Sequence, residues 1–267
     1  MKFSIKKLFN FCLDLLFPIE CLECGKEGNW LCENCFRKLD LAHPQYCLHC
    51  KQENQFGEFC TSCKHQYALD GVFIAGNYQG IIQKLIKNFK YRFNYNLGQS
   101  LGKFLNLFLL NLLKKSQLQN IPIEIPFLNS KKETLLVPVP LHKRRHRWRG
   151  FNQAAILADS LSAQFQIKIN HQLVRTRYQK AQAKLNRKTR LANLHNAFAW
   201  VTLTSPRYPQ FCEAKIKKNL KLKNNLKNYN ILLVDDVVTS GATLNECARI
   251  LKDAGAHKVW GVVLANG

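Results

Sequence analysis

The sequence predicts an α/β fold, with a mainly parallel sheet flanked by helices behind a small cysteine-rich module. Three observations lead to this prediction. Four C-x2-C pairs lie within residues 21–63, apolar strands alternate with helical segments from residue 71 onward, and the chain ends in a strand–helix–strand unit. Strands that alternate with helices are typical of domains with parallel sheets. With 267 residues, the chain has room for one large domain and one small one.

The charge of the chain is its unusual property. Forty Lys and Arg residues stand against 17 Asp and Glu, which gives a formal net charge of +23. The other proportions, 46% hydrophobic and 21% charged residues, are those of a globular protein. Such an excess of positive charge favours partners rich in phosphate, namely nucleotides, nucleic acids or an anionic membrane.

The first 20 residues place lysines before an apolar stretch, as a signal peptide does. However, Asp14 interrupts the apolar stretch, Pro18 ends it, and no small-residue cleavage site follows. The stretch is too short to span a bilayer, so no transmembrane segment is expected. We expect a cytoplasmic protein in which residues 1–20 form an amphipathic helix. This helix packs on the body of the protein or, as the alternative, rests on a membrane surface.

The cysteine pairs have the spacing of zinc ligands. Each C-x2-C pair forms a turn that points two thiolates at one metal ion, and two pairs complete a tetrahedral site. The simplest assignment is two sites in sequential order, with an interleaved pairing as the alternative. The ligands are then Cys21, Cys24, Cys32 and Cys35 for the first site, and Cys47, Cys50, Cys60 and Cys63 for the second.

Two other uses of cysteine compete with zinc. A disulfide framework requires an oxidising compartment, and a redox C-x-x-C motif normally occurs singly at the start of a helix. Because four thiolates complete each zinc site, the two ions are expected to hold the fold and not to catalyse. We predict this module over residues 21–66. Cys12, Cys212 and Cys247 remain, and each is most simply a small apolar residue.

The segments after the cysteines alternate between strand and helix. Residues 71–78 favour a strand, residues 81–91 an amphipathic helix and residues 96–115 a long apolar helix. The apolar face of the first helix consists of Ile82, Leu85, Ile86 and Phe89. Residues 116–133 contain two prolines and little periodicity, so we expect a loop or insertion there.

The second half begins with an apolar run, 134–140, that predicts a buried parallel strand. We expect a basic turn and a helix near 152–165 after it, and a further strand at 195–202. The segment 203–229 contains two prolines and many lysines, and we expect it to loop out. The final unit consists of a strand at 231–234, a helix at about 243–254 and a strand at 259–265.

The stretch ILLVDDVVTSGATL, residues 231–244, has the pattern of a phosphate site. An apolar strand ends in Asp235 and Asp236, and a turn of small residues then opens a helix. The N–H groups of such a turn, the helix dipole and three hydroxyls suit a phosphate. The paired carboxylates suit a ribose diol with Mg²⁺ nearby. The turn residues are Thr239, Ser240, Gly241, Ala242 and Thr243.

A purely structural interpretation competes with this one. The two aspartates would then form an ordinary strand end, and Thr243 would cap the helix. This interpretation does not account for the strand, the acid pair and the turn together. In either case we expect Asp236 to face solvent and to contribute little to packing.

The segment VDDVVTSGAT resembles the signature with which type I phosphoribosyltransferases bind phosphoribosyl pyrophosphate (PRPP). Further segments, together with the cysteine module, resemble the ComF family of competence-associated proteins, in which a double zinc ribbon is fused to a phosphoribosyltransferase domain. These segments are residues 89–98, 137–158 and 188–198. The resemblance covers nearly the whole chain, apart from the expected loops at 116–133 and 203–229.

The resemblance implies a type I phosphoribosyltransferase-like domain over residues 71–267 that binds PRPP with Mg²⁺. The acidic pair would contact the ribose hydroxyls, and the turn at 239–243 would surround the 5′-phosphate. The loop after the VPVP strand would grip the pyrophosphate through His142, Lys143 and Arg144.

The resemblance also implies a part in handling single-stranded DNA during natural transformation. The partners would be single-stranded DNA and the competence helicase or other DNA-uptake proteins. Two alternatives stay open, an enzyme that transfers phosphoribose to an unknown acceptor and a non-catalytic PRPP sensor.

Positive charge concentrates in two stretches, the second of which lies in a window without carboxylates between Asp159 and Glu213. These cations could close over the site, but they are more numerous than one PRPP molecule needs. Single-stranded DNA could bind the remaining basic residues. Trp148, Phe151 and Tyr178 are then either stacking surfaces for its bases or parts of the core. The basic residues are Arg144, Arg145, Arg147 and Arg149, then Arg175, Arg177, Lys180, Lys184, Arg187, Lys188 and Arg190.

Overall fold

The computed structural model describes residues 19–66, 68–91, 95–118, 132–177, 196–201 and 226–267. Its centre is a five-stranded sheet in the order β3-β9-β8-β4-β5, with every neighbouring pair parallel. The strands are β3 (Gly71–Ile74), β4 (Glu133–Pro138), β5 (Lys168–Ile169), β8 (Tyr229–Val238) and β9 (Val259–Asn266). The predicted α/β fold with a parallel sheet is confirmed.

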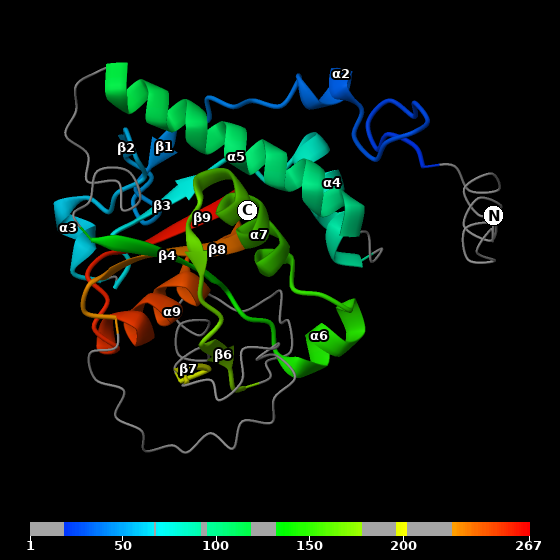
Figure 1. Cartoon of the computed structure of the whole chain (residues 1–267). Coiled ribbons are helices and arrows are strands. Elements are labelled where there is room, and N and C mark those ends of the chain that lie inside the picture. Colours follow the sequence, from blue (N-terminus) through cyan, green and yellow to red (C-terminus); the bar gives the residue numbers. More distant parts are fainter. Residues whose placement is uncertain (1–18, 67, 92–94, 119–131, 178–195, 202–225) are drawn as a thin grey trace.

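Helices cover both faces of the sheet (Figure 1). One face carries α4 (Gly80–Tyr91), α5 (Tyr95–Leu118) and α7 (Gln153–Phe165), and the other carries α9 (Ala242–Asp253). Side chains of β8 alternate between the two buried layers. Leu232 and Val234 join the first layer, and Ile231 and Leu233 join the second. Because both sides of the strand are buried, its sequence is an unbroken apolar run.

The predicted helices agree with the structure to within a few residues. The four residues expected on the apolar face of α4 are all buried: Ile82, Leu85, Ile86 and Phe89. α5 extends to Leu118, so the predicted loop at 116–133 begins later than expected. Residues 1–18, 119–131 and 202–225 lie outside the described part of the chain. They include most of the predicted N-terminal helix and most of each expected loop. Among the helices that the structure describes, none has the length and apolar character needed to cross a bilayer.

Two predictions around the site were wrong. The expected basic turn after β4 is a short helix, α6 (Lys143–Arg149), which begins after His142 and ends at Gly150 in the left-handed conformation. The strand with the acidic pair does not end at Val234. β8 continues to Val238, because its last residues stay in register with β9.

A second, antiparallel sheet lies beside α9. It consists of β6 (Leu173–Arg175) and β7 (Phe198–Trp200). The strand predicted at 195–202 is present as β7. β5 and β6 were not predicted, because strands of two and three residues leave too short a pattern to recognise.

The cysteine module lies against β3, the edge strand of the main sheet. It contains α2 (Glu33–Phe36), β1 (Gln45–Tyr46), β2 (Glu53–Asn54) and α3 (Thr61–Lys64). The N–H of Val72 donates to the carbonyl of Gly57 at 2.9 Å. The side chain of Gln45 both donates to the carbonyl of Ile74 and accepts from its N–H, at 2.9 and 3.0 Å. The module thus satisfies backbone groups that an open sheet edge would leave exposed.

Candidate phosphate and zinc sites

The cysteine module brings eight sulfur atoms into two clusters. Within each cluster the Sγ atoms lie within 4.8 Å of one another, and the members are Cys21, Cys24, Cys32 and Cys35, then Cys47, Cys50, Cys60 and Cys63. The structure groups the eight cysteines in the sequential order and not in the interleaved one. The Sγ atoms of Cys24 and Cys32 are 3.6 Å apart, as are those of Cys50 and Cys60. A tetrahedral zinc site separates its sulfurs by about 3.8 Å, so both clusters fit the ion.

The two clusters repeat one local structure. The residue after the second cysteine of the first pair has a positive φ in both, 74° at Gly25 and 66° at Lys51. Its N–H donates to the carbonyl of the first cysteine, Cys21 or Cys47, at 2.9 Å. The second pair in each cluster begins a short helix, α2 or α3. The doubled C-x2-C pattern is therefore a doubled structural unit.

The thiols of each cluster differ in their tendency to ionise. Burial opposes ionisation of Cys21, but N–H donors, first that of Cys32, outweigh it and lower its pKa to about 6. In the same cluster, burial and the neighbouring thiols raise the pKa of Cys35 to about 12. Four thiolates so close together need a cation between them, and a soft divalent ion such as zinc supplies it. The described cysteines are all free thiols, and Cys247 is buried, as predicted.

The acidic pair lies near the carboxyl end of β8, in the middle of the sheet. Adjacent residues of a strand point to opposite faces, so the two carboxylates have different surroundings. Asp236 points to the face of α4, and its Oδ1 accepts from Lys90 Nζ at 2.8 Å. The side chains of this ion pair are 12% and 17% exposed, respectively. The expectation that Asp236 faces solvent was therefore wrong.

Asp235 has its surroundings on the other face. The negative charge of Asp235 raises the pKa of Cys247 of α9. The positive charge of Arg175 of β6 acts on Asp235 in the opposite direction to burial and lowers its pKa. Burial, and then the charge of Asp236, raise the pKa of Asp235 to about 7, although the N–H of Asp236 donates to its Oδ1 at 2.9 Å. Burial lowers the pKa of Lys90, but Asp236 and Asp235 outweigh this and raise it above its ordinary value.

The turn that follows is shorter than predicted. Thr239, Ser240 and Gly241 connect β8 to α9, whereas Ala242 and Thr243 already form the first turn of the helix. The N-cap is Gly241, with a φ of 74° and no capping side chain, so the interpretation of Thr243 as the cap was wrong. Without such a side chain, the first N–H groups of α9 are oriented for an external anion. That these residues bind phosphate stays a prediction.

α6 presents different residues to the interior and to solvent. His146 and Arg149 are buried, whereas Trp148 is 54% exposed. The exposed residues, called the outer face below, are Lys143, Arg144, Arg147 and Trp148. Of the predicted pyrophosphate loop, His142 is half-buried and accepts from the N–H of Arg144 through Nδ1.

The three aromatic residues predicted as possible stacking surfaces differ in where they lie. Trp148 lies on the outer face of α6, where more than half of it is exposed. Phe151 instead packs against Phe89, with ring centroids 5.5 Å apart, so it belongs to the core. Tyr178 and the basic residues from Lys180 to Arg190 lie outside the described part of the chain.

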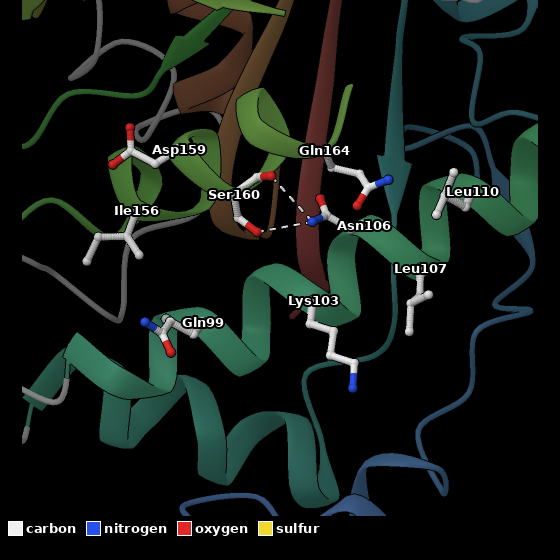
Figure 2. A pocket seen from close by; sticks show the side chains of 10 residues that line it. Gln99, Lys103, Asn106, Leu107, Leu110, Ile156, Asp159, Ser160 and Gln164 are labelled. Atoms are coloured by element: carbon white, nitrogen blue, oxygen red, sulfur yellow. Dashed lines mark hydrogen bonds between the residues drawn. The ribbon is translucent and has the colours of Figure 1, made fainter. Parts of the chain in front are cut away.

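A separate depression lies between α5 and α7, as Figure 2 shows. It has a volume of about 450 Å³, and none of the residues predicted to bind phosphate lines it. Asn106 donates to the carbonyl and the hydroxyl of Ser160 across it, at 3.3 and 3.1 Å. Ser160 also packs closely on Gly102, where a side chain would collide with it. These contacts identify the depression as a seam between two packed helices.

Two known protein domains match the sequence of the chain. Residues 12–64 match the double zinc ribbon domain, and residues 150–267 match the phosphoribosyl transferase domain. Competence protein F of Haemophilus influenzae is 29% identical over 258 residues, which cover 93% of this chain and 98% of that protein. The chain is therefore a homologue of a competence protein along nearly its whole length.

Other relatives are similar to the chain as well. Competence protein ComFC of Bacillus subtilis is 25% identical over 237 residues, 86% of this chain and 81% of that protein. DNA utilization protein YhgH of Escherichia coli is 34% identical over 128 residues, 47% of each chain. The two domain matches leave residues 65–149 of the chain between them, although β3 and β4 from that stretch belong to the same sheet as β8. The predicted boundaries at 21–66 and 71–267 stay predictions.

Sequence reasoning missed Lys90, which pairs with Asp236 in the candidate site. The residue falls within the segment 89–98 that carried the resemblance, but its helix offers no signal that singles it out. Lys84 and Lys87 occupy the same helix and are exposed. The pairing of Lys90 with Asp236 depends on a contact between residues far apart in sequence, which local patterns do not reveal.

Proposed function

We propose that this ComF-like protein binds PRPP at the carboxyl edge of its sheet and takes part in handling single-stranded DNA during DNA uptake. The first part is supported by the VDDVVTSGAT stretch, which spans the end of β8 and the start of α9. The 5′-phosphate would meet the N–H groups of the turn and of the first residues of α9. The ribose diol would meet Asp235 and Asp236. The pyrophosphate, which carries Mg²⁺ on its own oxygens, would lie toward residues 142–144 at the start of α6.

The part in DNA uptake is supported by the relatives and by charge. Two of them are named as competence proteins and one as a DNA utilization protein. The net charge of +23 and the basic outer face of α6 suit a nucleic-acid backbone. Transfer of phosphoribose to an acceptor is the alternative activity of the same site, and a PRPP sensor is the non-catalytic one.

The proposed phosphate turn is tested with a matched pair of glycine substitutions. Gly241 and Gly255 lie at the two ends of α9, with φ values of 74° and 99°. Valine at either position strains the backbone, but valine at 241 also fills space that the phosphate needs. We expect Gly241→Val to weaken PRPP binding about tenfold or more and Gly255→Val to change it less than about threefold, as measured by titration calorimetry. Wild type that binds PRPP no better than Gly241→Val would refute the proposal.

The same titration separates the alternatives when it is followed by an assay of pyrophosphate release. Wild type is incubated with PRPP and Mg²⁺ over a panel of nucleobases and amines. Release with one acceptor would establish an enzyme. Binding without release would favour the DNA-handling protein or the sensor.

Binding of single-stranded DNA should depend on the outer face of α6. We expect replacement of Lys143, Arg144 and Arg147 by alanine to lower the slope of log K against log salt by about 2, because each lost phosphate contact removes about 0.7. Trp148→Ala should weaken binding because a stacking contact is lost, and it should leave the slope unchanged. The measurement is fluorescence anisotropy with a labelled oligonucleotide at several salt concentrations. An interaction that does not respond to salt would show that the outer face does not bind DNA.

A further inference from the structure

Basic side chains approach the acidic pair from both faces of the sheet. Lys90, from α4, donates to Asp236 on one face and is largely buried. Arg175, from β6, lies on the face of α9, where its charge acts on Asp235. Its guanidinium also lies over the ring of Phe198, with the Cζ atom 5.2 Å from the ring centroid.

A third basic side chain comes from α6. Arg149 is 8% exposed, and its Nη1 donates to Gln153 of α7 at 3.1 Å. Arg149 is close enough to Lys90 for its positive charge to lower the pKa of that lysine. Lys90, Arg149 and Arg175 are called the inner cations below.

The inner cations come from three different elements and lie around the acidic pair of β8. Burial and the charge of Asp236 raise the pKa of Asp235 to about 7, so at neutral pH this carboxyl is protonated part of the time. Positive charge held away from water is costly unless an anion neutralises it. A pyrophosphate supplies several negative charges, and the guanidinium fork matches the spacing of phosphate oxygens.

The exposed cations of α6 are less suited to this task. Lys143 and Arg144 lie in solvent, where water and salt screen their charges. Arg149 is buried and Lys90 and Arg175 are half-buried, so they act in a medium of lower dielectric and each contributes more to an anion bound between them.

We infer that the inner cations bind the pyrophosphate group of PRPP, and that Lys143 and Arg144 contribute little to that contact. This inference rests on the proposed function, because it assumes that PRPP occupies the carboxyl edge of the sheet. It divides the basic residues into a buried or half-buried group for the small ligand and an exposed group for a polyanion at the surface.

Each inner cation has a neighbour that serves as a matched control. The pairs are Lys90→Met with Lys87→Met on α4, Arg149→Met with Arg147→Met on α6, and Arg175→Met with Arg177→Met. All three control residues are exposed. Titration calorimetry with PRPP and with inorganic pyrophosphate should show affinity lower by roughly ten- to hundredfold for each inner variant and by less than about threefold for each control.

Ribose 5-phosphate distinguishes ligand contact from general damage to the site. Arg149→Met and Arg175→Met should bind it within about threefold of wild type, because its phosphate lies at the turn after β8. Thermal unfolding identifies a variant that does not fold, in which case Lys90→Arg and Arg149→Lys, which keep the charge, should bind PRPP more weakly than wild type but more tightly than the methionine variants. If wild type binds PRPP but inner and control variants bind it equally, the inference fails and the proposed function stands. If wild type binds neither PRPP nor ribose 5-phosphate, the proposed function itself fails.

Discussion

Serine in place of Cys60 is expected to remove one zinc ion per chain and to cause aggregation as well as a lower melting temperature. The second zinc cluster holds the segment that covers the open edge of β3. In that segment Asn54 Oδ1 accepts from the N–H groups of residues 56–58, and the carbonyl of Gly57 accepts from Val72. Once the cluster loses its metal, this segment loosens and β3 offers free backbone groups to another chain.

The expected loss is large compared with the stability of the fold. Structural zinc contributes about 10–16 kcal/mol in small zinc domains, whereas a whole domain is stable by about 5–15 kcal/mol. Cys32→Ser in the first cluster should also lose one ion. It should aggregate less, because the residues around that cluster, such as Leu31 and Phe36, pack on the helical layer and not on the sheet edge.

Elemental analysis, thermal unfolding and light scattering measure these effects. Wild type should carry about two zinc ions per chain. Cys247→Ser is the matched control, since Cys247 is fully buried but belongs to neither cluster, and it should retain both ions. Wild-type protein purified without chelator that contains no zinc would contradict this account of the module.

Local patterns predicted the fold well where an element is long or strongly periodic. The apolar face of α4, the length of α5 and the final strand–helix–strand unit could all be predicted, because each repeats one rule over many residues. The boundaries failed where tertiary contacts decide. β8 continues past Asp235 because β9 offers partners up to Asn266, and the polar residues in between gave no sign of that.

The candidate site was predicted in its parts and not in its assembly. The acidic pair and the turn are contiguous in sequence, so one motif contained them. Lys90, Arg149 and Arg175 come from three elements that meet only in the folded chain. The residue types gave a further wrong impression, because four arginines on α6 looked equivalent, whereas the turn of the helix buries Arg149 and exposes Arg147.

Substitution of the two aspartates should change stability in opposite directions. The pKa of Asp235 is raised from its ordinary value of 3.8 to about 7, mainly by burial and by the charge of Asp236. Below pH 4 the carboxyl is protonated in both the folded and the unfolded chain, and the shift costs nothing. As the pH rises to about 7, the unfolded chain releases this proton more readily, so the free energy of unfolding falls, by roughly 4 kcal/mol at most. Asparagine cannot ionise and removes this cost.

We therefore expect Asp235→Asn to be more stable than wild type at pH 8 by about 1–4 kcal/mol and nearly equal to it at pH 4. Asp236→Asn should be less stable by about 1–3 kcal/mol at pH 8, because Lys90 then loses the carboxylate 2.8 Å away. Denaturant unfolding at the two pH values measures both effects. A lower stability of Asp235→Asn at pH 8 would show that this carboxyl is not strained.

Both substitutions should nevertheless weaken PRPP binding, by roughly ten- to hundredfold, because each removes a charged acceptor for a ribose hydroxyl. A residue that costs stability and supplies affinity is kept for its ligand, since a chain selected for stability alone would replace it. Asp235 would be such a residue, and Asp236 would combine both roles through Lys90. Titration calorimetry at pH 8 with PRPP tests this. If Asp235→Asn gains stability and keeps full affinity, the ribose contact belongs to Asp236 alone and the role of Asp235 in the proposed site is wrong.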